Sequence, residues 1–599
     1  LGYTALQASD TASQNVAIGK AALLADTKGA QSVAVGANTL QSQNFTTATN
    51  TFNVAVGYFA GQQVTTGQQN TLLGHSTGDA VTTGSGNTLL GYNAGGAEST
   101  GSNNVIIGQA GQAQTLTSDT VAVGDGALQT NTKSAKNTAI GRSALRNVNH
   151  TTATDAYNTA LGYNAGLSVT TGIENTLIGG LAGDALTDAD HNVAVGALAL
   201  GADTLGSRNI AIGYAALSTQ NFTTATNAYN VGIGHAAGNN VTTGIFNTFV
   251  GGLTGDSITT GSYNVAVGGA ALDSETAANQ SVAIGTSALT NQNVGGGTDA
   301  HNVAVGGNAG QNVTTGVKNV LIGGLVGDAI TDADNNVAVG FQSLGANQLG
   351  SNSVAVGSDA LLDQNPASAV DMYNVAVGHH AGRLVTTGIQ NTIVGGLAGD
   401  ALTTSDFNVA MGYAALGAEQ AGTRNVAIGY GALTSQTRST AAVTYNTGLG
   451  FQTGYYNVTG TGNTYVGYNA GAGVSGNSQS GNTVVGALAF DIVTTGNNNT
   501  VVGNQAGDTI TTGSNNTLVG HQVQVSGGTG VQQIAIGTGF SGGGNNTVRF
   551  GVPAGTATLS LDGSDTSWAA ASDQRLKKDI ADSTVGLSFV NALRPVTFK

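Results

Sequence analysis

The sequence predicts an all-β protein, a parallel β-solenoid in which one small coil of about 17 residues is stacked many times. Glycine closes an Asn-x-x-x-Gly pentad at a fixed interval, as at Gly57, Gly74, Gly91 and Gly108. The residues between Asn and Gly are mostly apolar, and only 8% of the chain is charged. A short period that persists along a chain indicates one supersecondary unit repeated along an axis. We therefore expect an elongated repeat protein.

The 17-residue coils are themselves grouped into a longer repeat. Steps of 17, 17, 17 and 21 residues make a 72-residue superrepeat, which places equivalent glycines at Gly162, Gly234, Gly306, Gly378 and Gly450. The 21-residue step adds four residues to one turn, always before the same coil of the superrepeat. We expect these longer turns to protrude at regular intervals along the solenoid.

Composition argues against several other classes of protein. Glycine accounts for 94 of 599 residues and proline for only 3. This balance indicates that the glycines occupy defined positions of a folded backbone, because a disordered tract of this kind would be rich in proline as well. The net charge is −15 without basic clusters, so we expect no nucleic-acid partner. The chain has no cysteine, and hence neither disulfides nor thiolate metal sites. No apolar run is long enough to span a bilayer, so we expect no membrane insertion.

Each pentad predicts a strand that is apolar on both faces. In Asn53-Val54-Ala55-Val56-Gly57, the two valines point to one side of the strand and Ala55 to the other. A coil of this size can cover only one face with a second strand of its own, which we expect at Val64-Thr65-Thr66. The other face needs another chain, because a strand with two apolar faces is buried on both. The pattern therefore predicts an oligomer.

The two ends of the pentad have structural roles. The asparagines of successive coils are expected to stack in an amide ladder, and the glycines to allow tight turns. A second glycine ten residues after the first, such as Gly67, is expected to adopt positive φ in the opposite turn. The predicted structural residues are Asn53, Gly57, Asn70, Gly74, Asn230, Gly234, Asn302, Gly306, Asn374 and Gly378.

The pentads resemble a known family of surface proteins. Asn15-Val16-Ala17-Ile18-Gly19 and Asn425-Val426-Ala427-Ile428-Gly429 are similar to the head repeats of trimeric autotransporter adhesins. The resemblance implies a left-handed parallel β-roll in which three chains pack around one axis. It therefore implies a homotrimer, which fits the second apolar face.

The longer turns are the candidate binding sites. They carry or precede aromatic residues, of which we single out Phe45, Tyr157, Phe222, Tyr229 and Tyr373. One interpretation is a repeated weak contact with a cell-surface glycan or receptor, which gains avidity from its number. The other is a regular bulge that sets the twist or caps a groove of the trimer, and the uniformity of the turns favours it.

Other motifs indicate geometry and not chemistry. Thr187-Asp188-Ala189-Asp190 lacks the glycine and distal glutamate of a calcium loop, so we interpret it as a polar turn. Gly179-Gly180-Leu181-Ala182-Gly183 has no lysine or helix after it, unlike a phosphate loop. Paired threonines such as Thr65-Thr66 suggest an ice-binding face, but they occupy only some coils. We expect no metal, no cofactor and no enzyme activity of the solenoid.

The C-terminal segment is different. Ser572-Asp573-Gln574-Arg575-Leu576-Lys577 and the later Gly586-Leu587-Ser588-Phe589 resemble the start of the intramolecular chaperone domain of endosialidase-type phage tail fibres. The resemblance implies trimerisation, followed by autoproteolysis in which Ser572 attacks the bond after Ala571 with help from Lys577. Such a lysine needs a lowered pKa to accept the proton. The alternative is a charged helix start with Ser572 as its N-cap.

These observations predict three segments and one main function. Residues 1–551 form the solenoid shaft, 552–571 a transition segment, and 572–599 the start of the chaperone domain, while the N-terminus begins inside a repeat. We expect a trimeric structural or adhesive fibre, extracellular, from a virion tail or a bacterial cell surface, that attaches to a host or surface. The alternatives are a structural extracellular filament without a ligand and a tailspike that degrades glycans, which would need a carboxylate pair in a cleft.

Overall fold

The computed structural model of the chain is all-β and describes residues 2–115, 117–561, 563 and 569–570. It contains no helix among these residues, and hence none that could cross a membrane. The chain folds as a parallel β-solenoid of about 31 turns with coils of about 17 residues, which confirms the predicted fold class. It forms two compact units, Leu1–Met372 and Tyr373–Lys599.

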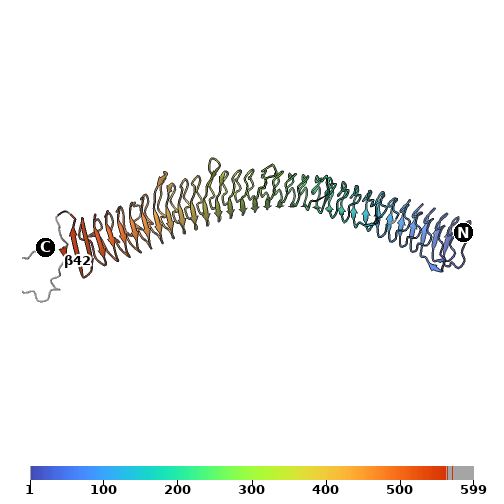
Figure 1. Ribbon diagram of the computed structural model, residues 1–599, viewed down its shortest axis with the longest axis horizontal. Coiled ribbons are helices and arrows are strands. Elements are labelled where there is room, and N and C mark those ends of the chain that lie inside the picture. The colour runs from blue at the N-terminus through green and yellow to red at the C-terminus, as the bar shows by residue number, and fades with distance from the viewer. Residues whose placement is uncertain (1, 116, 562, 564–568, 571–599) are drawn as a thin grey trace, which may run out of the picture. The chain divides into compact units, whose positions relative to one another are not determined.

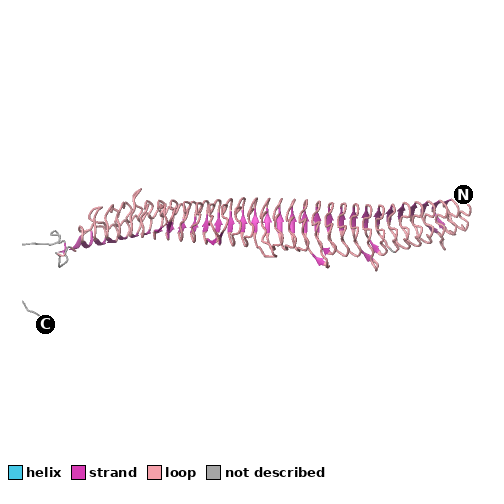
Figure 2. Cartoon of the chain, turned by 90° about the horizontal axis from the view of Figure 1, so that it is seen from above, coloured by secondary structure: helices cyan, strands magenta, loops and turns pink. Residues whose placement is uncertain are grey.

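In the first unit, each coil contributes one strand of three residues, and these strands lie side by side in chain order (Figures 1 and 2). The strands are β1 (Val16–Ile18), β3 (Val33–Val35), β5 (Val54–Val56), β6 (Thr71–Leu73), β7 (Thr88–Leu90), β8 (Val105–Ile107), β9 (Val121–Val123), β11 (Thr138–Ile140), β13 (Thr159–Leu161), β14 (Thr176–Ile178), β15 (Val193–Val195), β17 (Ile210–Ile212), β19 (Val231–Ile233), β20 (Thr248–Val250), β21 (Val265–Val267), β22 (Val282–Ile284), β23 (Val303–Val305), β24 (Val320–Ile322), β25 (Val337–Val339) and β27 (Val354–Val356).

The second unit repeats this arrangement and ends in an antiparallel hairpin. Its parallel strands are β29 (Val375–Val377), β30 (Thr392–Val394), β31 (Val409–Met411), β33 (Val426–Ile428), β35 (Thr447–Leu449), β36 (Thr464–Val466), β37 (Thr483–Val485), β38 (Thr500–Val502), β39 (Thr517–Val519), β40 (Ile534–Gly537) and β41 (Thr547–Val552). β41 pairs with β40 in parallel and with β42 (Gly555–Ser560) in antiparallel orientation, and β42 pairs with β43 (Ala569–Ala570). The reversal of strand direction ends the regular coil.

The longer turns form small sheets of their own. Each folds against the preceding coil, and the pairs are β2 (Gly29–Ala30) with β4 (Thr49–Asn50), β10 (Ser134–Ala135) with β12 (Thr154–Asp155), β16 (Gly206–Ser207) with β18 (Thr226–Asn227), β26 (Gly350–Ser351) with β28 (Val370–Asp371), and β32 (Gly422–Thr423) with β34 (Ala442–Val443). A single bridge, Asn279 to Asp299, marks the same place in another coil. The extra residues are therefore ordered by main-chain hydrogen bonds.

Glycine is required in the pentad because the coils approach closely. Gly57 has φ of +140°, and a Cβ there would lie closer than 3.0 Å to the carbonyl oxygen of Gly74 in the next coil. The prediction for Gly67 is wrong, since its φ is not positive. A Cβ at Gly67 would instead collide with the carbonyl oxygen of Gly84. Close stacking, and not a left-handed backbone, selects glycine at this second position.

The predicted second strand at Val64-Thr65-Thr66 is also wrong. This segment is a bend, although the Thr65 N–H donates to the Thr82 carbonyl oxygen of the next coil at 2.9 Å. The stacking continues there without the paired geometry of a strand. The turn before it explains why, because left-handed residues at Phe59 and Gly61 fold the chain tightly back.

The core of each coil is one side chain deep. The central strand residue points inward, and Ala55, Leu72 and Leu89 are fully buried. Val64 and Val81 close the core from the opposite side and are also fully buried. Because successive coils stack in register, these side chains form a continuous inner column.

We expect Gly234→Ala to destabilise its coil by about 2 kcal/mol or more, because an L-residue is strained at φ of +139° and its Cβ would strike Gly251. Hydrogen exchange of peptides over residues 230–255, followed by mass spectrometry, measures the effect. The matched control is Gly252→Ala, since a Cβ there meets nothing within 4 Å. Equal exchange in the two variants would refute the role of close stacking.

Candidate functional site: the outer face of the sheet

The strands present a face to the outside that is built from four columns of side chains, and we call it the outer face. One coil shows the arrangement in the sequence Tyr229-Asn230-Val231-Gly232-Ile233-Gly234-His235. Tyr229, Val231, Ile233 and His235 lie on the outer face, whereas Asn230 and Gly232 are buried. Column one is thus the residue before the pentad, columns two and three are the outward strand residues, and column four follows the glycine.

Column three is aliphatic, column two mixes Val and Ile with Thr, and both columns are half-exposed. In the pentad strands that the structure describes, from β1 to β39, column three is Val, Ile, Leu or Met, and column two is Val, Ile or Thr. Ile212 is 37% exposed, and Leu161 and Leu449 are each 45% exposed. The face of a sheet that meets water usually carries polar side chains, so the uncharged strip formed by columns two and three indicates an interaction surface.

Columns one and four contain stacked aromatic rings. In the first unit, Tyr229, Phe246 and Tyr263 stack with ring centroids 5.1 and 5.2 Å apart in column one. In the second unit, column four stacks four rings at 5.2 to 5.4 Å, namely Tyr413, Tyr430, Phe451 and Tyr468. Stacked pairs at these distances are attractive by about 0.5–1.5 kcal/mol each. The aromatic columns flank the aliphatic ones.

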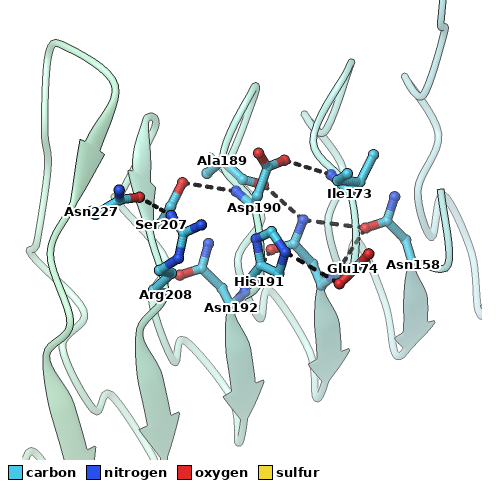
Figure 3. Close-up of polar contacts among 11 residues, drawn as sticks. Asn158, Ile173, Glu174, Ala189, Asp190, His191, Asn192, Ser207, Arg208 and Asn227 are labelled. Carbon is cyan, nitrogen blue, oxygen red and sulfur yellow. Dashed lines mark hydrogen bonds and ion pairs between the residues drawn. The ribbon is translucent and has the colours of Figure 1, made fainter.

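Column one also carries charges. His191 Nε2 lies 3.2 Å from Glu174 Oε2, and the next residue along the column, Arg208, donates a hydrogen bond to Asn227 (Figure 3). Lys136 lies 2.7 Å from Asp155 and 5.0 Å from the centre of the Tyr157 ring. These groups are partly exposed, so each pair contributes little to stability, and their sequence along the column varies from coil to coil.

The asparagines connect the coils inside this face. Asn53 donates through Nδ2 to the Gly67 carbonyl oxygen at 2.8 Å, and its Oδ1 accepts from the Asn70 N–H at 2.9 Å. The same pattern joins Asn158 to Asn175 and Asn175 to Asn192 (Figure 3). Each side chain thus links the two walls of its own coil and the backbone of the next. The pentads of Asn302 and Asn374 make the same bond to a carbonyl oxygen, at Gly316 and Gly388.

The predicted binding residues divide into two groups. Tyr157, Tyr229 and Tyr373 lie in column one and are 52%, 43% and 52% exposed. Phe45 and Phe222, on the longer turns, are only 5% and 6% exposed. The tyrosine side chains are therefore exposed on the outer face, whereas the phenylalanines pack inside their turns.

Sequence reasoning missed a buried polar network beneath four of the longer turns. Asp203 Oδ2 accepts from Gln220 Nε2 at 2.6 Å, and its Oδ1 accepts from the N–H groups of Gly206 and Phe222 at 3.1 and 3.2 Å. Gln220 Oε1 in turn accepts from Asn230 Nδ2 at 2.8 Å. Burial raises the pKa of Asp203, and these hydrogen bonds oppose the shift. The network holds the start of the turn against the asparagine ladder.

The same acid–Gln–Asn triple recurs in other coils. The equivalent sets are Asp26, Gln43 and Asn53; Glu275, Gln292 and Asn302; and Glu419, Gln436 and Asn446. Ordinary coils have Val64, Leu186 or Val241 at the position of the acid, seven residues after the pentad glycine. An acid at this core position followed by glutamine 17 residues later was the signal in the sequence.

No family model matches the chain, and no curated protein is similar to it.

The other motifs that the sequence suggested are the aspartate-containing turns, the threonine pairs and the C-terminal serine and lysine. The first two form hydrogen bonds within the solenoid, and the last lie outside the described residues. Asp190 Oδ1 accepts from the Ile173 N–H at 2.8 Å (Figure 3). Asp188 accepts from the Thr171 hydroxyl. The first threonine of each pair also bonds to the next coil, as Thr65 Oγ1 donates to the Thr82 carbonyl oxygen at 3.1 Å. The part of the chain that the structure describes contains no group of three His, Asp or Glu that could hold a metal. Ser572 and Lys577 lie outside the described residues.

Half-buried aspartates line one turn of the coil, five residues after the pentad glycine. Burial raises the pKa of Asp79, Asp184, Asp328, Asp400 and Asp491. Burial, together with a hydrogen bond and charge repulsion from Asp273 in the next coil, raises the pKa of Asp256 to about 7. Asp256 is therefore expected to keep its proton up to near-neutral pH.

We expect Asp203→Ala to loosen the longer turn at residues 219–227, because Gln220 and two backbone N–H groups lose their acceptor in the core. The expected cost is about 1–3 kcal/mol for each unsatisfied group, seen as faster hydrogen exchange of this turn. The exposed Asp188→Ala is the control. The double variant Asp203→Leu with Gln220→Val, which copies an ordinary coil, should regain stability. Unchanged exchange in Asp203→Ala would contradict the role of the network.

The pH dependence follows from the raised pKa values. Between the unfolded pKa near 3.8 and the folded value of about 7, folded Asp256 binds more protons than the unfolded chain. Stability therefore falls as pH rises through this window, and the thermal midpoint should be higher at pH 5 than at pH 8. Asp256→Asn should reduce the difference, whereas the exposed Asp125→Asn should not. A midpoint that rises from pH 5 to pH 8 would disprove this.

Proposed function

We propose that the chain is the shaft of a homotrimeric fibre, either a phage tail fibre or a bacterial surface adhesin. The fibre attaches to a host cell or another surface. One observation carries the proposal, which is the uncharged strip formed in each unit by aliphatic column three and by the Val, Ile and Thr residues of column two. A coil of about 17 residues has no further segment to cover it, so sister chains are the partner that matches its length and repeat.

The free energy gained by burying these side chains between chains is large enough to support assembly. Full burial of a Val, Leu or Ile side chain is worth about 1.5–3 kcal/mol, so covering a half-exposed one contributes roughly 1 kcal/mol. Column three supplies such an apolar residue in every pentad strand from β1 to β39, and column two supplies a second one where it is Val or Ile, which together give tens of kcal/mol per chain. This exceeds the cost of association, which is about 4–15 kcal/mol. The resemblance of the pentads to trimeric adhesin heads supports three chains around one axis.

The 72-residue superrepeat suits display along such a fibre. Longer turns at equal spacing would offer the same contact many times, and many weak contacts give avidity for a cell-surface glycan or receptor. The exposed column-one tyrosines Tyr157, Tyr229 and Tyr373 would then lie at the rim between sister chains. The same face, without a ligand, would give a structural filament.

Correct alignment is the main difficulty for such a fibre. Repeats this similar can pair out of register by one coil at little cost in contacts. We propose that the segment from Ser572 starts a chaperone that aligns the three chains and is then released, with Ser572 as nucleophile and Lys577 as its activating base. Self-cleavage before Ser572 would leave a product whose C-terminal residue is Ala571.

The trimer is tested by sedimentation of the purified chain. We expect a mass of three times 58.9 kDa at micromolar concentration. Lysine at column three of three adjacent coils, in Ile212→Lys, Ile233→Lys and Val250→Lys together, should abolish or weaken assembly, because it would place charges in an apolar interface. The matched control places three lysines on exposed turn tips, at Thr47, Thr152 and Thr224. A monomer in the parent chain would contradict the proposal.

A further inference from the structure

One coil near the end of the second unit breaks the regular stacking. In many coils, such as the one after Gly306, the N–H six residues after the pentad glycine donates to a main-chain carbonyl of the next coil, as Asn312 does to Asp328 at 3.2 Å. At the equivalent Thr509, the acceptor is instead the side-chain Oε1 of Gln524, at 3.3 Å. A side chain has replaced the backbone that normally covers this turn.

The backbone departs because the next coil takes a shorter path. After Gly503, the inward residues Ala506 and Ile510 are four positions apart, whereas after Gly520 the buried residues Val523 and Val525 are only two apart. Fewer residues therefore pass around this corner. The following coil does not fill the space, and a hollow of about 220 Å³ opens between them, lined by Asp508, Gln522, Gln524, Gly539, Phe540 and Ser541.

The walls of the hollow are held in place by hydrogen bonds. Gln524 Nε2 donates to the Gln505 carbonyl oxygen at 2.9 Å and to Asp508 Oδ1, while its Oε1 accepts from the Thr509 hydroxyl at 2.9 Å. The other oxygen of Asp508 accepts no hydrogen bond from the described residues. The hollow therefore keeps one carboxylate oxygen available.

The opposite wall is fixed by an arginine. Arg549 Nη1 donates to the Ser541 carbonyl oxygen at 2.7 Å, and its Nη2 donates to Thr556 Oγ1 at 2.7 Å. Its guanidinium carbon lies 5.8 Å from the centre of the Phe540 ring. The arginine is thus engaged with this wall, and it positions the ring and the Ser541 backbone beside the carboxylate.

The lining selects a class of ligand. Asp508 and its neighbour Asp491 repel anions, and the charge of Asp508 contributes to the raised pKa of Asp491. The amide N–H of Gln524 already occupies Asp508 Oδ1 and disfavours a cation there. A carboxylate, two amides, a hydroxyl and one aromatic ring suit a neutral polyhydroxylated molecule with an apolar face. The hollow is smaller than the roughly 300 Å³ of drug-sized pockets, so it admits one small ring.

We propose that this hollow is a binding subsite for a single pyranose ring of a neutral glycan. Asp508 accepts hydrogen bonds from its hydroxyls, the Gln522 amide accepts from or donates to others, and Phe540 contacts its C–H face. The inference deepens the proposed attachment function and rests on it for biological meaning. The subsite itself is formed within one chain.

Saturation-transfer NMR on the intact chain tests the subsite, with the methyl glycosides of glucose, galactose, mannose and N-acetylglucosamine as probes. We expect at least one to bind, with transfer strongest to ring C–H protons. Asp508→Asn keeps an acceptor for Gln524, and we expect it to weaken binding at least tenfold, as should Phe540→Ala. The matched control is Asp328→Asn, at the equivalent turn position of a regularly stacked coil, and it should bind like the parent chain.

Two results would overturn the proposal: no binding of any of the four glycosides, or equal binding by the parent chain and both hollow variants. The circular dichroism spectra of the variants establish that they are folded. Failure of the subsite is distinct from failure of the fibre proposal, because sedimentation reports assembly independently. A trimer that binds none of the probes would leave the fibre proposal standing without this subsite, whereas a monomer that binds them would do the reverse.

Discussion

A small coil encloses a core that is only one side chain deep, and this limit governs the rest of the structure. The central strand residue, such as Ala55 or Leu72, fills the interior completely. Its neighbours on the same strand face outward, and there the residue before the glycine is aliphatic in coil after coil, while the other is Val, Ile or Thr. Hydrophobic burial is the dominant favourable term in folding and association, and a single chain leaves these outward side chains partly exposed.

The coil survives at this small size because its polar groups are paired along the axis. Asparagine links the two walls of its coil and the next coil through one side chain, as Asn70 does with Gly84 and Asn87. The pentad glycine allows backbones to approach where any side chain would collide. Stability in such arrays is a sum of small units and their contacts, so the fold depends on repetition and not on a large core.

The sequence predicted the periodic part of the structure well and the exceptions poorly. The strand at each pentad follows from alternation and period, because both reflect the backbone directly. The bend at Val64-Thr65-Thr66 was mistaken for a strand, since β-branched residues also suit a stacked bend that bonds to the next coil. The role of Asp203 was missed because only the folded coil shows that its position belongs to the core. Likewise, the shorter path after Gly520 gives no periodic signal, although it creates the hollow beside Asp508.

The central claim is that sister chains cover the aliphatic columns of the outer face. Electron cryomicroscopy of the purified chain in solution tests it most directly, because side-chain positions relative to a symmetry axis become visible. We expect three chains around one axis, with column-three residues such as Ile212 and Ile233 facing the neighbouring chains. A single solenoid with these residues in contact with water would contradict it.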